Sequence, residues 1–238
     1  MHFKSTGLVG NGKWGKIIQK KISSISKLHF IANSKSKYLN KLDKIDWIFI
    51  ATPDHTHFNV VNKCIKKKVN IFCEKPLTKT YTESLKLFQR AEKNKILLYV
   101  DEIQSFLKKK IKIKKYNYIT RQKKSFGNPK DLLFRFAYHD FYYLYEKVKN
   151  EKISNIKIIN IKDCLEFKID FEKKIFHFYY SLNSEKRIHS FNSINLLTKK
   201  DILSKMIKDV LNEKVDFKNN KNKSLFANKL IDRIIKKI

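Results

Sequence analysis

The chain has 238 residues, of which 53 are Lys or Arg and 22 are Asp or Glu, so its formal net charge is +31, and 42% of its residues are hydrophobic. That length and hydrophobic content support a buried core and exclude a disordered tail. The absence of a long apolar run excludes a membrane span, and an N-terminus without a signal-peptide pattern predicts a cytoplasmic protein.

A glycine-rich loop follows the first apolar run, in the segment TGLVGNGKWG. GNGKWG matches G-x-G-x-x-G, and a helical pattern of apolar residues comes directly after it. In a dinucleotide-binding fold the first glycine makes a tight turn, the second admits the pyrophosphate, and the third lets helix and strand pack closely. The sequence therefore predicts a dinucleotide site, and its expected contacts are Gly10, Gly12, Lys13, Trp14 and Gly15.

The second expected strand ends near Ala32 and indicates which dinucleotide is preferred. NAD sites place an acidic residue about twenty residues after the fingerprint, on the ribose hydroxyls. No Asp or Glu precedes Asp43, and Asn33, Ser34 and Lys35 occupy this position instead. Small polar groups and a cation suit a 2′-phosphate, so the pattern favours NADP, with NAD as the alternative.

Two further strands lead to the remaining candidate loops. The apolar run IDWIFIAT predicts a buried parallel strand that ends before Pro53, and VNIFC predicts another that leads into Glu74-Lys75-Pro76. A helix over 81–95 and a strand over 96–100 follow. Strands that alternate with helices predict a right-handed, doubly wound parallel sheet, whose ligand lies at the carboxyl ends of the strands.

The second half predicts a different kind of domain. The segments 164–171, 174–182 and 188–194 alternate as strands do, and 201–214 and 224–238 are amphipathic helices. We expect a Rossmann-type domain over 1–104 and a reduced α/β domain with a mostly antiparallel sheet over 105–238. The aromatic alternation is expected to form sheet core. Cys64, Cys73 and Cys164 predict buried, reduced thiols and no metal site.

The motifs GNGKWG, ATPDHTH and EKPLTKT, taken in this order, resemble the Gfo/Idh/MocA oxidoreductases, the family of glucose-fructose oxidoreductase and inositol dehydrogenase. The similarity covers roughly the first hundred residues, and EKP, one helix after the T-P…H loop, is its specific part. Family members typically join a Rossmann domain to a C-terminal α/β domain with an open sheet. They use NAD or NADP, usually on sugars, sugar nucleotides or cyclitols.

The resemblance also implies roles for individual residues. Lys75 corresponds to the lysine that meets the substrate and the nicotinamide ribose, and Glu74 shapes its loop. Thr52, Pro53 and His57 correspond to residues that border the cofactor. An ammonium at this place could bind the carbinol oxygen and assist the proton step of hydride transfer. The alternative is that Lys75 is a structural lysine that caps a strand end.

The family's D-x-x-x-H pattern has a counterpart in DLLFRFAYHDFYYLYE. His139 fits the histidine and is a candidate catalytic helper. Arg135 stands where the family has aspartate, and it could bind an anionic group of the substrate. This departure leaves three alternatives: a changed substrate, a histidine that acts alone, or lost catalysis.

The expected function is thus an NAD(P)-dependent oxidoreductase that acts on a sugar-type small molecule, with a homodimer possible and no membrane partner. Two alternatives stay open. One is a degenerate relative that only binds NADP(H). The other is a nucleic-acid-binding protein that uses the charge of +31. The excess of Lys over Arg and the spread of lysines along the chain favour compositional drift over nucleic-acid binding.

Overall fold

The computed structural model describes residues 3–33, 35–107 and 109–238. The chain forms two compact units: one holds the residues up to Ile103 and returns with Asp201–Asn228, and the other holds Gln104–Lys200 and Lys229–Ile238. The first boundary falls next to the expected break after residue 104. The segment 201–228, which the sequence placed in the second domain, instead packs with the first unit.

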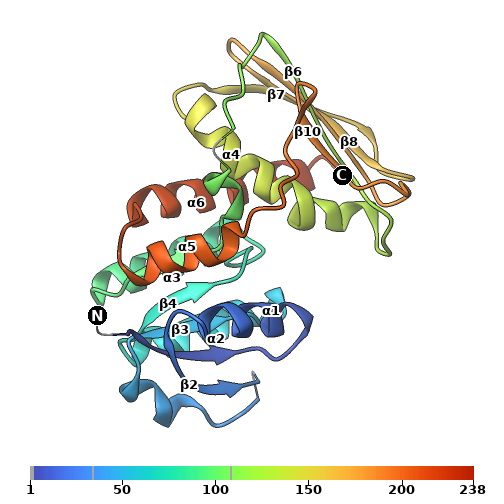
Figure 1. Ribbon diagram of the computed structural model, residues 1–238. Helices are drawn as coiled ribbons and strands as arrows, with labels where there is room; N and C mark the ends of the chain where they lie inside the picture. The colour runs from blue at the N-terminus through green and yellow to red at the C-terminus, as the bar shows by residue number, and fades with distance from the viewer. Residues whose placement is uncertain (1–2, 34, 108) are drawn as a thin grey trace. The chain divides into compact units, whose positions relative to one another are not determined.

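The first unit contains a parallel sheet of five strands, as predicted, and Figure 1 labels β2, β3 and β4 in it. The order of the strands is β2-β1-β3-β4-β5. The strands are β1 (Ser5–Val9), β2 (Lys27–Ala32), β3 (Trp47–Ile50), β4 (Asn70–Cys73) and β5 (Leu98–Val100). The four residues of β3 are fully buried, as expected for a strand covered on both faces. The chain leaves β1 for β2 on one side and returns to β3 on the other, which places the topological switch point beside β1.

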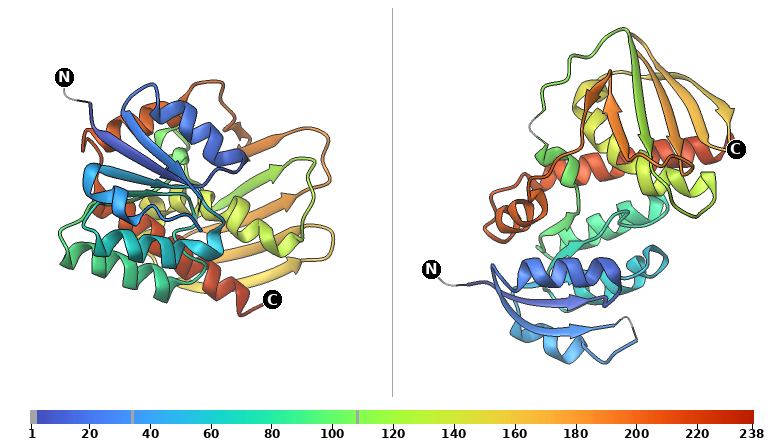
Figure 2. Two further views of the ribbon diagram at one scale, coloured as in Figure 1. Left: turned by 90° about the horizontal axis from the view of Figure 1, so that it is seen from below. Right: turned by 45° about the vertical axis from the view of Figure 1, so that its right-hand side comes forward.

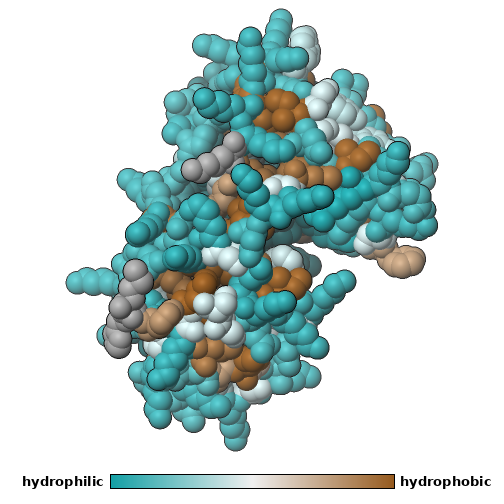
Figure 3. Space-filling model, in the orientation of Figure 1, coloured by the Kyte–Doolittle hydropathy of each residue, from teal (hydrophilic) through white to brown (hydrophobic). Residues whose placement is uncertain are grey.

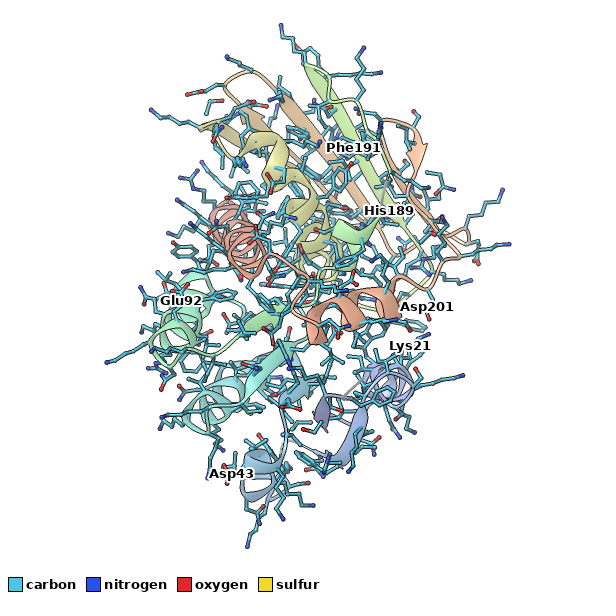
Figure 4. All side chains as sticks on the ribbon, turned by 60° about the vertical axis from the view of Figure 1, so that its left-hand side comes forward. Lys21, Asp43, Glu92, His189, Phe191 and Asp201 are labelled. Atoms are coloured by element: carbon cyan, nitrogen blue, oxygen red, sulfur yellow. The ribbon has the colours of Figure 1, made fainter. Side chains whose placement is uncertain are left out.

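Helices cover both faces of this sheet: α1 (Lys13–Ile22) packs with α5 (Ile202–Leu211), and α2 (His57–Lys66) packs with α3 (Tyr81–Lys93). Two short 3-10 helices, η1 (Leu39–Lys44) and η2 (Asp54–Thr56), lie in the connections. An ion pair of 2.6 Å joins Lys21 of α1 to Asp201 at the start of α5, and Figure 4 labels both residues.

An asparagine from helix α6 (Phe217–Ile235) explains why the returning segment belongs to the first unit. Asn220 Nδ2 donates to the carbonyl of Val100 at 2.8 Å, and the Val100 N–H donates to Asn220 Oδ1 at 2.9 Å. The buried amide thus satisfies backbone groups of the edge strand β5, where another strand would otherwise pair. The apolar face of α5 adds Met206, Ile207 and Val210 to the core.

The second unit is built on a six-stranded sheet in the order β11-β10-β6-β9-β8-β7. Only β6 and β9 pair in parallel, so the sheet is mostly antiparallel, as predicted. Its strands are β6 (Tyr116–Gln122), β7 (Ile153–Asn160), β8 (Leu165–Phe171), β9 (Ile175–Ser181), β10 (Ile188–Phe191) and β11 (Ile194–Asn195).

One helix, α4 (Tyr138–Val148), packs on one face of this sheet (Figure 2). The Phe141 ring lies 6.3 Å from that of Phe167 and 5.4 Å from that of Phe178, centroid to centroid. The predicted aromatic core of the sheet is therefore present. Short helical turns precede α4: the 3-10 helices η3 (Ile103–Phe106) and η4 (Pro129–Asp131), and the π-helical turn η5 (Leu133–Ala137).

Hydrophilic side chains cover most of the face seen in Figure 3, and hydrophobic ones occupy small separate areas. Within the described residues, no helix has the length and apolar character that a membrane crossing requires. Cys64, Cys73 and Cys164 are buried free thiols.

Candidate active site

The glycine loop combines two crowded positions with one open position. Gly10 has φ +123°, and a Cβ built on it would lie 2.3 Å from the carbonyl oxygen of Ala51. A Cβ on Gly15 would lie 2.1 Å from the carbonyl oxygen of Gly10, whereas a Cβ on Gly12 would have no atom within 4 Å. Gly10 and Gly15 are therefore required for close packing of β1, α1 and the end of β3. Gly12 leaves open space at the start of α1.

This geometry fits a dinucleotide. Gly12 is the N-cap of α1, no side chain caps the helix, and its first turn carries no acidic residue. The N-terminus of a helix attracts anions through its exposed N–H groups and its dipole. Open space in front of such a helix, at the switch point of a parallel sheet, is the arrangement in which a pyrophosphate binds.

Alanine substitutions should separate packing from binding in this loop. Gly15→Ala is expected to lower the unfolding free energy by roughly 2–4 kcal/mol, since its methyl group meets backbone atoms that cannot move aside. Gly12→Ala should cost no more than about 1 kcal/mol, the difference between these residues at an N-cap. Urea unfolding measures the loss of unfolding free energy in each variant. It is monitored by the fluorescence of Trp14 and Trp47, which both lie in the first unit. Equal losses would contradict this assignment.

The turn after β2 is polar and carries no carboxylate between residues 33 and 36. Asn33 Oδ1 accepts from the N–H of Lys35 at 2.9 Å, and the Asn33 N–H donates to Ser36 Oγ at 3.2 Å. Gly10 donates its N–H to the carbonyl of Ala32 at 2.8 Å, so this turn adjoins the glycine loop. Lys35 is exposed, and Ser34, another expected contact, lies outside the described residues.

His57 links the two other candidate loops. Its side chain is 1% exposed, with Nε2 2.8 Å from the carbonyl oxygen of Thr52 and Nδ1 2.8 Å from that of Pro76. Burial lowers the pKa of His57, although both carbonyls favour a protonated ring. Both ring nitrogens thus hold the loops after β3 and β4 together. The role of His57 beside a cofactor stays a prediction.

Glu74 is a buried carboxyl group at the end of β4 and is 8% exposed. Trp14 Nε1 donates to its Oε1, which connects the glycine loop to the Glu74-Lys75-Pro76 segment. Its side chain also hydrogen-bonds to Asp101, which follows β5 and is 2% exposed. Asp101 is not among the predicted site residues, yet an acidic residue directly after a predicted parallel strand lies by position at this sheet edge.

Lys75 is half-buried, and its peptide bond to Pro76 is cis. The segment that follows is fixed by buried polar groups: Thr78 Oγ1 lies 2.7 Å from Ser84 Oγ, and Asn228 Nδ2 donates to the Thr78 carbonyl at 2.9 Å. Gly10, Thr52, Glu74 and Lys75 thus lie at the carboxyl edge of one sheet, as expected. The catalytic role of Lys75 stays a prediction.

Arg135 and His139 belong to the second unit. Arg135 lies in the π-helical turn η5 and donates to the carbonyl of Phe126 at 2.8 Å and to Ser125 Oγ at 2.9 Å. His139 lies in α4, which begins only at Tyr138, so a π turn separates the two residues from the regular α-helical spacing of a four-residue pair. Their expected roles at a substrate stay predictions.

The residue after His139 has a clearer structural role. Asp140 is 4% exposed and accepts from Arg121 Nη2 at 2.7 Å, from the Tyr180 hydroxyl at 3.0 Å, and pairs with His189 Nε2 at 3.1 Å. Arg121 and His189 lower the pKa of Asp140 to about 2 against the opposing effect of burial. This network fixes α4 to β6, β9 and β10, and no local pattern in the sequence predicts it.

A hollow of about 510 Å³ lies on the second unit's sheet. Tyr116 and Tyr118, which are 64% and 43% exposed, line it together with His177 and Lys168. Asp170 also lines it, and Glu166 pairs with His177 at 2.6 Å, so the hollow carries both signs of charge. A mixed lining of this kind does not favour the phosphates of a nucleic acid.

Residues 17–102 match an oxidoreductase family with an NAD-binding Rossmann fold. An uncharacterised oxidoreductase of Schizosaccharomyces pombe is 32% identical over 76 residues, or 29% of this chain and 21% of that protein. Another from Escherichia coli, YgjR, is 33% identical over 57 residues, or 24% of this chain and 17% of that protein. The matched segment thus spans about a fifth of the length of these curated relatives.

Two solved structures share the fold of the whole chain. UDP-N-acetylglucosamine 3-dehydrogenase GnnA from Acidithiobacillus ferrooxidans superposes with a TM-score of 0.79 at 16% identity, over 95% of this chain and 96% of that chain. The WlbA (WbpB) dehydrogenase from Thermus thermophilus, in complex with NAD and UDP-GlcNAcA, has a TM-score of 0.75 at 12% identity, over 96% and 94%. At these identities the similarity shows the fold alone.

Proposed function

Since this chain belongs to the Gfo/Idh/MocA oxidoreductases, we propose that it is a nicotinamide-dependent dehydrogenase that acts on a CH–OH group of a sugar, sugar nucleotide or related polyol. The observation that carries the proposal is the sheet edge of the first unit. There, the open position at Gly12 and the segment Glu74-Lys75-Pro76 are connected through the bond from Trp14 to Glu74.

Different residues at this edge would hold different parts of the dinucleotide. The N-terminus of α1, with Gly12 and Lys13, would hold the pyrophosphate. Asn33 and Lys35 would face the adenosine ribose, and the lack of a carboxylate there favours a 2′-phosphate and hence NADP over NAD. Thr52 and Pro53 would border the nicotinamide side, where His57 fixes their loop.

Nicotinamide supplies the hydride acceptor or donor when it is bound. Lys75 supplies the proton chemistry that must accompany hydride transfer at a carbinol carbon. Its ammonium donates a hydrogen bond to the substrate oxygen, stabilises negative charge that develops there, and exchanges a proton with it. Lys75 is half-buried, so its side chain is only partly exposed to water.

The proposed substrate class is supported by the relatives' fold. GnnA is a UDP-N-acetylglucosamine dehydrogenase, and the WlbA structure contains UDP-GlcNAcA. Both superpose on nearly the whole of this chain, including its second unit. We therefore favour a sugar or sugar nucleotide over a simple alcohol as the substrate.

Titration with NADPH and with NADH at moderate salt, followed by nicotinamide fluorescence, tests the cofactor site. The wild type should bind NADPH more tightly. Gly12→Asp should reduce the affinity by at least roughly tenfold, since it places a carboxylate beside the pyrophosphate. Asp is a favoured N-cap, so the variant should fold.

The outcomes separate the alternatives. Binding that is lost in Gly12→Asp but persists in salt supports the proposal. Binding without turnover on a panel of sugars and sugar nucleotides would identify a relative that only holds the cofactor. Affinity that disappears with salt and ignores Gly12 would overturn the proposal in favour of general attraction to anions.

A further inference from the structure

We propose that Asp101 is a positioning residue for Lys75: it shares one proton with Glu74, and the single negative charge of this pair keeps Lys75 protonated toward the substrate. The inference rests on the proposed function of Lys75. It adds Asp101, which follows a different strand, to the residues of the proposed site. It also explains why two acidic side chains, Glu74 and Asp101, are buried next to Lys75.

Strand pairing brings the two carboxyl groups together. Cys73 of β4 pairs with Val100 of β5, so the residues that follow them leave the sheet side by side. The Asp101 N–H donates to the carbonyl of Cys73 at 2.8 Å, which fixes its backbone next to Glu74. The two buried side chains are hydrogen-bonded to each other. A carboxylate has no proton to donate, so a hydrogen bond between two carboxyl groups requires a proton on one of them.

Fixed donors occupy one oxygen of each group. Trp14 Nε1 donates to Glu74 Oε1, and the N–H of Ile103 donates to Asp101 Oδ1 at 3.1 Å. Each carboxyl group keeps a second oxygen. One shared proton then satisfies the pair and leaves a single negative charge, which these two donors stabilise.

The other titratable groups near the pair, among the residues that the structure describes, include Tyr99, Glu102, Lys223 and Cys73. Tyr99 donates to Glu102 Oε1 at 3.4 Å, and Glu102 Oε2 pairs with Lys223 at 3.7 Å. Burial raises the pKa of the Cys73 thiol well above its ordinary value, so this neighbour stays neutral. Lys75 is the cation that lowers the pKa of both Glu74 and Asp101 by its charge.

That interaction is reciprocal. A cation that favours ionisation of a carboxyl pair is itself held in its protonated form by the same energy. Burial raises the pKa of Glu74 most, and the neighbouring Asp101 raises it further, and both effects favour a proton on the pair. Two charges on the pair would be costly in this buried place, so the singly charged pair is the favoured form.

Infrared difference spectroscopy tests the shared proton without any activity. The wild type at pH 7 should show a band of a protonated buried carboxyl, and both Glu74→Gln and Asp101→Asn should lose it. Glu102→Gln is the matched control, because Glu102 is equally buried but ion-paired, and it should retain the band. A wild type without the band, or a band that survives both substitutions, would overturn the proposal.

Competitive acetylation with acetic anhydride tests the effect on Lys75. In the double variant Glu74→Gln/Asp101→Asn, the rate at Lys75 near neutral pH should rise roughly tenfold or more, since an amine that loses a nearby anion loses its proton more readily. The exposed Lys86 should not change. An unchanged rate at Lys75 would show that the pair does not set its protonation. Failure of NADPH binding would refute the proposed function and leave both results intact.

Discussion

Asp140→Asn is expected to lower the unfolding free energy of the second unit by about 3–5 kcal/mol. Arg121 is 8% exposed and directs Nε and Nη2 at this carboxylate, at 2.9 and 2.7 Å. An asparagine cannot accept both bonds and carries no charge, so the guanidinium would stay buried without compensation. The Tyr180 hydroxyl and His189 would lose the same acceptor.

Amide hydrogen exchange measured on β6, β9 and β10 follows this loss, since both tryptophans lie in the first unit and do not monitor the second. Glu185→Gln is the control. It removes an ion pair to Lys124 whose side chains are 76% and 72% exposed, and it should change stability by no more than about 0.5 kcal/mol. A loss below about 1 kcal/mol in Asp140→Asn would show that the network is dispensable.

Acid should reduce the difference between the wild type and Asp140→Asn. The pKa of Asp140 is lowered from 3.8 to about 2 in the folded state. Its stabilisation, about 2 kcal/mol from this shift, is therefore complete above pH 4 and is lost as pH falls toward 2. A difference that stays constant down to pH 2 would contradict the ionised state of Asp140.

Lys75→Met is expected to lower turnover by roughly 10²–10⁴-fold on whichever sugar or polyol the panel identifies. Methionine keeps much of the side chain's apolar volume but can neither bind the substrate oxygen nor exchange a proton with it. Binding of NADPH should persist, since the proposed pyrophosphate contacts come from the loop at Gly12. Steady-state kinetics and the fluorescence titration measure the two effects separately.

Lys79→Met provides the matched control four residues along the same segment. Lys79 is about half exposed and pairs with Asp54 at 3.6 Å, so its loss should leave turnover nearly unchanged. Equal losses in the two variants would indicate a general effect of charge on this surface. Full activity in Lys75→Met would refute the assignment of the proton step to Lys75.

The first unit could be predicted because its signals are local. The glycine loop, the apolar strands and Pro76 each determine structure within a few residues of themselves. The composition made the glycine motif more specific, since three of the five glycines in the chain fall in one loop. The parallel sheet then followed from the regular alternation of strand and helix.

The features that were missed depend on contacts between distant residues. Strand β6 directs Tyr116 and Tyr118 outward and buries Asn117, Thr120 and Arg121, which reverses the polarity expected of a strand. Arg121 can be buried only because Asp140 and its partners lie on other elements. The role proposed for Asp101 likewise depends on Glu74, which is distant in sequence but follows the adjacent strand of the sheet.

The return of residues 201–228 also constrains how the protein is made. The N-terminal strands leave the ribosome first, but Asn220, which completes the edge of β5, follows only after the whole of 104–200 has been synthesised. At ordinary elongation rates this interval is roughly 5–20 s. During that time β5 presents unpaired backbone groups to other nascent chains, so misassembly at this edge stays possible until Asn220 has been synthesised.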